Sequence, residues 1–174
     1  MADPCVTDTA YIDLETAGTP AVLSATLRNP EETFSGTEGD DTTHNVTDTG
    51  VVHTLSQTFN ISNAGGSAVC KGVVVLAVNP IFVHATSGDV TLVPFARLTI
   101  DGVIADERDV PAAGIDVPQD TSQLLSLGAL VGQLDIPAGG NVDVDILVTI
   151  ENIGASESWS FRMGGSKLVA QMGF

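Results

Sequence analysis

The stretch TFNISNAGGSAVCKGVVVLAV, residues 58–78, contains the two patterns that decide the fold. Apolar and polar residues alternate up to Ile61, small residues fill 64–67, and an almost unbroken apolar run reaches Val78. Alternation with a period of two is typical of a strand with one buried face. A β-branched apolar run bounded by glycine and proline is typical of a central strand rather than a helix. The stretch therefore predicts a strand, a turn and a central strand, none of them carrying an obvious catalytic group.

The same alternation recurs along the chain, at residues 21–28, 51–61, 90–100 and 142–150. In the last of these runs, the even-numbered residues are apolar and predicted to face a core, while Asp143 and Asp145 face outward. Asp101-Gly102 between two alternating runs predicts a tight hairpin. Residues 122–134 fit either a short helix or an irregular strand. The sequence thus predicts an all-β protein: a single antiparallel β-sandwich, jelly-roll or Ig-like, with eight to ten strands and at most one short helix.

The length of 174 residues suits one domain with a substantial core, so we expect residues 1–174 to form a single β-sandwich domain. Residues 1–19 form a polar segment, which we interpret as an N-terminal arm. Residues 31–50 are polar, acidic and rich in threonine and glycine, and predict a long acidic loop. A loop of this length is uncommon in a compact domain unless it has a function.

The charge balance narrows the classes of partner. The chain has 22 Asp and Glu residues against 6 Lys and Arg residues, a formal net charge of -16. Such a charge repels phosphate backbones and anionic lipids, so we expect no nucleic-acid partner and no membrane partner. The start MADPCVTDTAYIDLE lacks the basic and apolar regions of a secretory signal peptide. We therefore expect the chain to be made and kept in a cytoplasm.

Catalytic motifs are missing from the sequence. His44, His53 and His84 could converge as metal ligands in a jelly roll, but the close HxH-type spacing of such sites is absent, and we interpret them as ordinary polar or packed side chains. The GxSxG nucleophile motif and the phosphate-binding glycine spacings are also absent. The sequence predicts no enzyme, no cofactor and no metal.

Two acidic clusters have a calcium-binding alternative, because Ca²⁺ prefers oxygen ligands. One consists of Glu38, Asp40 and Asp41, and the other of Asp143 and Asp145 with Asp135 nearby. We favour solvated charge on an outer face for both. Cys5 and Cys70 are the only cysteines and can form one disulfide, within or between chains. We favour two free thiols, with Cys70 buried in a strand.

Three segments carry a resemblance to a known family: NISNAGGSAVCKGVVVLAV (60–78), LDIPAGGNVDVDILVTIENIG (134–154) and WSFRMGGSKLVAQMGF (159–174). They resemble the small β-sandwich proteins of tailed-bacteriophage virions, of the head decoration (cement) or head-fibre type. The resemblance implies a capsid decoration protein of the virion, made in the host cytoplasm, that stabilises the head by binding between capsid subunits. It implies the major capsid protein or other virion subunits as partners, and a homo-oligomer with a trimer favoured.

The alternative function is a carbohydrate- or cell-surface-binding β-sandwich, such as an adhesin or a receptor-binding tip. Modules of this kind stack exposed aromatic rings on sugar rings. The candidates for such stacking are few: Tyr11, Phe34 and Trp159.

Overall fold

The computed structural model describes residues 6–7, 13–15, 21–26, 43–63, 69–78, 80–110, 113–163 and 167–173. These segments contain fifteen β-strands and no helix. The strands are β1 (Val6–Thr7), β2 (Asp13–Glu15), β3 (Ala21–Thr26), β4 (His44–Val46), β5 (Val52–Ser62), β6 (Cys70–Ala77), β7 (Ile81–Ala85), β8 (Val90–Ile100), β9 (Val103–Asp109), β10 (Ile115–Val117), β11 (Ser122–Leu125), β12 (Ala129–Ile136), β13 (Asn141–Asn152), β14 (Trp159–Met163) and β15 (Lys167–Gly173). The predicted all-β class is confirmed, and ten of the strands have five or more residues.

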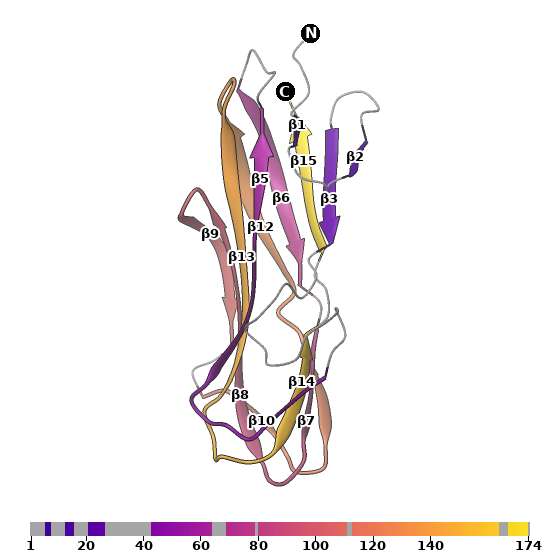
Figure 1. The fold of residues 1–174 in the computed structure, drawn as a ribbon, viewed down its shortest axis with the longest axis vertical. Coiled ribbons are helices and arrows are strands. Elements are labelled where there is room, and N and C mark those ends of the chain that lie inside the picture. Colours follow the sequence, from indigo (N-terminus) through magenta and orange to yellow (C-terminus); the bar gives the residue numbers. More distant parts are fainter. Residues whose placement is uncertain are drawn as a thin grey trace.

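The strands form two layers that face each other across an apolar core (Figure 1). The first layer is one sheet in the order β1-β5-β13-β8-β10, with β9 also paired to β8. The second layer consists of two sheets that lie end to end along the long axis of the molecule (Figure 1). Their orders are β12-β6-β15-β3-β2 and β11-β7-β14-β4.

The two sheets of the second layer are the two halves of interrupted long strands. In both sheets the strands follow the same order, so β12 continues β11, β7 continues β6 and β15 continues β14. Pro80 lies at the break between β6 and β7, and a proline cannot donate a ladder hydrogen bond. Gly128, with φ of +73°, lies at the break between β11 and β12. The Val78 N–H donates to the Gly128 carbonyl (3.1 Å), so neighbouring strands stay bonded where both are interrupted.

The pairing of the strands identifies the topology. With each interrupted strand counted as one, β3/β4 pairs with β14/β15, β5 with β13, β6/β7 with β11/β12, and β8 with β9 and β10, all antiparallel. The first long strand therefore pairs with the last, the second with the second-to-last, and so on inward. This nested pairing is that of a jelly roll, which settles the choice between the jelly-roll and Ig-like alternatives.

Period-two alternation places side chains as the sequence predicts. Along β13, Val142, Val144, Ile146, Val148 and Ile150 are buried, whereas Asp143 is exposed and Asp145 is half-buried. Most of the remaining core comes from the inner faces of β5, β6, β8 and β12, together with the rings of β14.

Several short strands lie where the sequence predicts other structure. Residues 1–19 contain β1 and β2, and the segment 31–50 contains β4, which pairs with β14. Residues 122–134, for which the sequence left a short helix and an irregular strand open, form β11 and most of β12, so the strand alternative holds. A strand of two to four residues has too few positions to show alternation, and it is fixed by the backbone of its neighbour instead.

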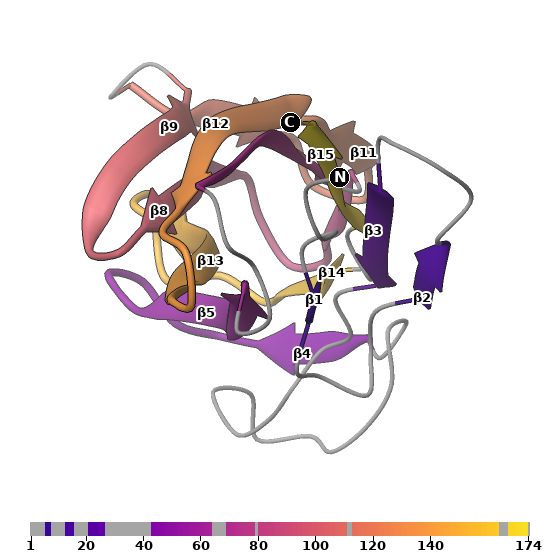
Figure 2. The same ribbon diagram turned by 90° about the horizontal axis from the view of Figure 1, so that it is seen from above.

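The two layers meet along one side, where β9 of the first layer lies beside β12 of the second (Figure 2). The β8–β9 register shifts between Leu98 and Thr99, which leaves Ala105 as the extra residue of a bulge. Gly132 in β12 faces this region: an added Cβ would lie 2.7 Å from Ile100 Cδ1 and 3.2 Å from Ala105 Cβ. Glycine at this position therefore permits the close approach of the two layers.

We expect Gly132→Val to destabilise the protein by roughly 1–3 kcal/mol, because the added atoms overpack a filled space between β9 and β12. Urea denaturation followed by tryptophan fluorescence measures the change. The control is Gln133→Val, which places the same side chain on the exposed face of the same strand. Equal stability of the two variants would contradict the close-packing role of Gly132.

Candidate functional site

The structure brings two of the three histidines together. His44 on β4 and His53 on β5 are both buried and both contact the ring of Phe161 on β14. His84 lies on β7, where Nδ1 hydrogen-bonds the Ser122 hydroxyl (3.0 Å). In the part of the chain that the structure describes, no three His, Cys, Asp or Glu side chains gather in a way that could hold a metal ion.

The buried histidines belong to a packed aromatic cluster. The His44 ring stacks on Phe161 with centroids 5.1 Å apart, and the His53 ring lies 4.8 Å from the same phenyl ring. Trp159 completes the cluster at 5.2 Å from Phe161 and 5.7 Å from His53. His53 Nε2 donates to the Asp48 carboxylate (3.0 Å), which fixes the orientation of that ring. The sequence contained no signal that would have paired Asp48 with a histidine.

The surroundings of His44 oppose its protonation. Burial, and secondarily the neighbouring His53, hold the pKa of the His44 imidazole below its ordinary value of 6.5. The folded protein therefore binds a proton at His44 less readily than the unfolded chain does. The contribution of His44 to the free energy of unfolding is fully present above about pH 6.5 and is lost as the pH falls below that value.

We expect the melting temperature to fall between about pH 7.5 and about pH 5, because the unfolded chain takes up protons that folded His44 resists. In His44→Phe, the new ring can still stack on Phe161 but does not titrate, so the fall should be smaller. Differential scanning calorimetry at both pH values provides the measurement. An equal fall in wild type and variant would rule out His44 as the source.

The acidic residues predicted as alternative calcium ligands do not converge. The Asp143 carboxylate accepts a hydrogen bond from the Asn60 amide (2.6 Å), and the Asp145 carboxylate accepts one from the Thr58 hydroxyl (2.6 Å). Asp135 lies on β12, in the other layer. The other predicted cluster lies outside the described residues: Glu38, Asp40 and Asp41.

Cys70 is buried at the start of β6 and forms a disulfide bond. The prediction of a free thiol is therefore wrong for this residue. The sequence has one other cysteine, Cys5, which lies outside the described residues. A disulfide stabilises a fold mainly by restricting the unfolded chain, and the effect grows with the length of the loop that it closes.

We expect reduction to lower the stability of the wild-type protein by about 2–4 kcal/mol, since the cross-link then no longer restricts the unfolded chain. Urea denaturation with and without a phosphine reductant measures this difference. The Cys70→Ser variant lacks the cross-link, so its free energy of unfolding should be the same with and without the reductant. Alkylation of Cys70 in unreduced, denatured protein, detected by mass spectrometry, would contradict the disulfide.

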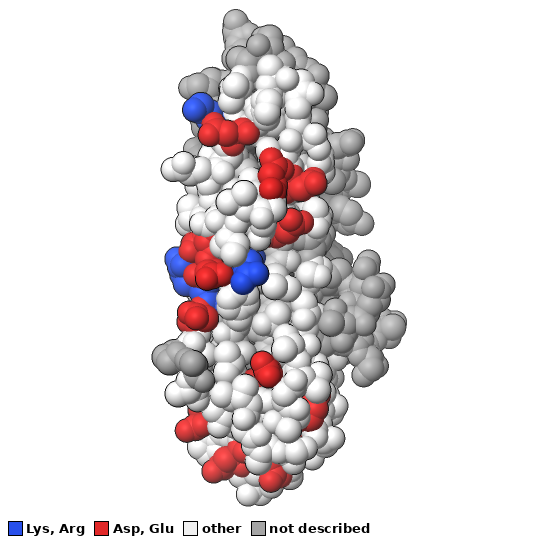
Figure 3. All heavy atoms as spheres, turned by 90° about the vertical axis from the view of Figure 1, so that its left-hand side faces the viewer, with Lys and Arg blue, Asp and Glu red and all other residues white. Residues whose placement is uncertain are grey.

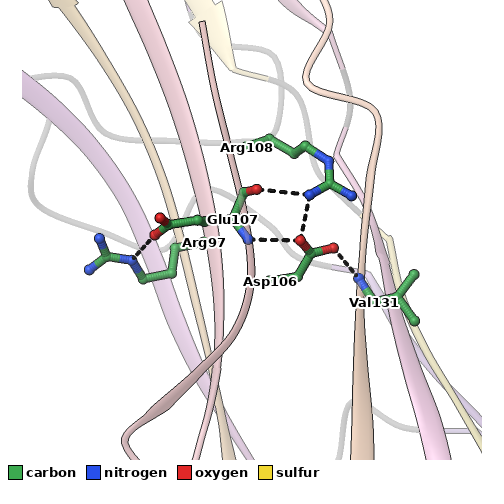
Figure 4. A network of polar contacts seen from close by, with 5 residues as sticks. All are labelled: Arg97, Asp106, Glu107, Arg108 and Val131. Atoms are coloured by element: carbon green, nitrogen blue, oxygen red, sulfur yellow. Dashed lines mark hydrogen bonds and ion pairs between the residues drawn. The ribbon is translucent and has the colours of Figure 1, made fainter.

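A charged network ties β9 to β12 where the two layers meet (Figure 4). One oxygen of Asp106 accepts a hydrogen bond from the Val131 backbone N–H (3.0 Å), and the other contacts the Arg108 guanidinium. The Val131 hydrogen bond, followed by the Arg108 contact, holds the pKa of the Asp106 carboxyl below its usual range despite partial burial. Glu107 pairs outward with Arg97 (3.3 Å). Since β12 ends its sheet, Asp106 occupies a backbone donor that would otherwise be open to another strand.

The outer side of β6 and β12 is mostly apolar, with Lys71, Gln133 and Asp135 as its polar side chains, and we call its apolar part the apolar β6–β12 face. Its side chains are those of Val69, Val73, Val75, Ala77, Ala129 and Val131. Val69, Val73 and Val131 have exposed fractions of 51%, 40% and 47%. Cross-strand pairing sets Val75 beside Val131. The apolar run correctly predicts a central strand, because β6 lies between β12 and β15, but the second side of β6 is not buried.

The outer side of β5 and β13 differs from this face. Outward positions of β5 and β13 carry Thr54, Ser56, Thr58, Asp143 and Asp145. On the side of the molecule drawn in Figure 3, acidic side chains are spread along the length and basic ones gather in small groups. The apolar β6–β12 face is therefore the candidate functional surface. Its signal in the sequence was the apolar run itself, whose exposure on one side the alternation rule cannot reveal.

No helix among the described residues is long and apolar enough to cross a membrane.

Comparison with known proteins places the chain in no family. No family model matches it, and no protein of curated function is similar to it in sequence. Among solved structures, it resembles infectious bursal disease virus Gx strain with a TM-score of 0.40 and 16% identity, over 95% of this chain and 38% of the other. The VP2 subviral particle of infectious bursal disease virus gives a TM-score of 0.39 and 14% identity, over 99% of this chain and 38% of the other.

A different kind of protein, TmCBM61 in complex with β-1,4-galactotriose, matches with a TM-score of 0.27 and 13% identity, over 90% of this chain and 85% of the other. The chain spans about two fifths of the length of the viral chains it matches. With TM-scores this low, none of these likenesses assigns a function.

Proposed function

We propose that this chain is a virion structural protein, a capsid decoration protein that stabilises a bacteriophage head by binding between capsid subunits. The observation that carries the proposal is the apolar β6–β12 face on a chain with a net charge of -16. A contiguous exposed apolar surface on a soluble domain is typical of a protein–protein contact. It lies on the regular strands of a sheet, which suit a permanent contact surface better than a catalytic cleft.

The remaining features of the chain support an assembly role. Jelly rolls serve viral capsids, lectins and cupins alike, so the fold leaves the choice of function to the residues. A cupin-like metal centre has no ligand set in the described segments, because His44 and His53 are held in ring contacts and His84 lies apart. The large negative charge repels nucleic acid, which fits a position on the outer surface of a filled head.

The carbohydrate-binding alternative lacks an aromatic platform in the described residues. Trp159 is only 1% exposed, so it cannot stack on a sugar. Phe82 and Phe95 are half-buried, and each lies close to an arginine: Arg162 at 5.6 Å and Arg97 at 5.0 Å from the ring centroids. The other two candidates, Tyr11 and Phe34, lie outside the described residues.

The proposal includes the partners and the location of the protein. The partners are the major capsid protein or other virion subunits, and the protein forms a homo-oligomer, with a trimer favoured. It is made in the host cytoplasm and resides in the virion.

We expect an antibody against this protein to detect it in particles purified from the producing culture by density-gradient centrifugation. Immunogold electron microscopy should then place it on heads rather than tails, since it binds between capsid subunits. Preimmune serum on the same particles is the control. Protein that stays entirely in the soluble fraction, while particles band without it, would contradict the virion role.

A further inference from the structure

The apolar β6–β12 face is unusual for the outer side of an antiparallel sheet, which is commonly polar where it meets water. Val75 and Val131 are paired across the two strands, and so are Ala77 and Ala129. Val73 adds a further exposed branched side chain on the same side of β6. These residues lie on regular, hydrogen-bonded strands, so the positions of their side chains on the face are fixed by the sheet.

Charge decides which partner fits this face. Two copies of a chain with a net charge of -16 repel each other over most of their surfaces. The charged residues on this outer side of β6 and β12 are Lys71 and Asp135, which pair with each other at 3.3 Å, so together they add no net charge to the face. A basic partner would instead be attracted to acidic surfaces such as that of Asp143 and Asp145. The face is therefore a place where two copies can approach without bringing like charges together.

We propose that a second copy of this chain docks on the apolar β6–β12 face. The inference deepens the proposed function, since it names the surface through which the decoration protein self-associates. Burial of the valine side chains drives the contact, and repulsion between the rest of the two chains opposes it. Added salt screens that repulsion, because the Debye length falls from about 10 Å at 0.1 M to about 3 Å at 1 M. Self-association should therefore strengthen as the salt concentration rises.

Sedimentation velocity of the purified chain over a range of micromolar concentrations, at low and high sodium chloride, tests the inference. The variant Val131→Lys places a charge on the face, and Val103→Lys places it at a position 69% exposed on β9, which is not one of the two strands that form the face. Both variants have a net charge of -15 (-16 plus 1), so general repulsion changes equally in the two. Unchanged melting temperatures would show that both fold.

The wild type should form an oligomer that salt strengthens. Val131→Lys should raise its dissociation constant by about tenfold or more, the size expected for a charge forced into an interface centre, and Val103→Lys should leave it near the wild-type value. A wild type that stays monomeric at every concentration and salt would overturn the inference. So would an oligomer that Val131→Lys leaves intact, or one that both variants weaken equally.

The same proteins separate this inference from the proposed function. A monomeric wild type found on heads by immunogold labelling would retain the virion role and overturn self-docking. An oligomer that Val131→Lys dissociates, in a protein absent from particles, would support self-docking and overturn the virion role.

Discussion

The pairing of β13 on both of its edges is the constraint on which the rest of the structure depends. This twelve-residue strand bonds to β5 along one edge and to β8 along the other, and it runs the length of the first layer (Figure 1). The second layer has no such continuous element, because its strands break near Pro80 and Gly128. The apolar inner side of β13, from Val142 to Ile150, packs into the core between the layers. The unbroken first layer therefore supports both halves of the broken one.

Alternation in the sequence was enough to find the long strands and to assign their inward sides. It could not find β1, β2, β4 and β10, because strands this short are defined by the neighbours they pair with. It could not show whether the outer side of β6 is covered, since an apolar residue looks the same in the sequence whether it is buried or exposed. The Cys70 disulfide and the His53–Asp48 contact depend on three-dimensional proximity, for which two cysteines and a loop aspartate carry no local pattern.

The polar features of the described residues divide between two roles. The Asp106 network and the ring cluster around Phe161 act within the fold: one joins the edges of the two layers, and the other packs β4 and β5 against β14. Other acidic side chains, such as that of Asp143, are exposed and contribute to the net charge of -16. The outer side of β6 and β12 combines exposed valines on two neighbouring strands with a single ion pair, and the functional proposals concentrate there.

The nested pairing of the strands also limits when folding can finish. Ala21 on β3 pairs with Met172 on β15, 151 residues later in the chain (172 minus 21). Contacts of such long sequence separation form slowly, because a large loop must close before they return any stabilisation. During synthesis, β3 therefore cannot pair with β15 until residues 167–173 have left the ribosome. The jelly roll therefore cannot close before β15 has been made, and its apolar strands depend on the solubility of the unfinished chain in the meantime.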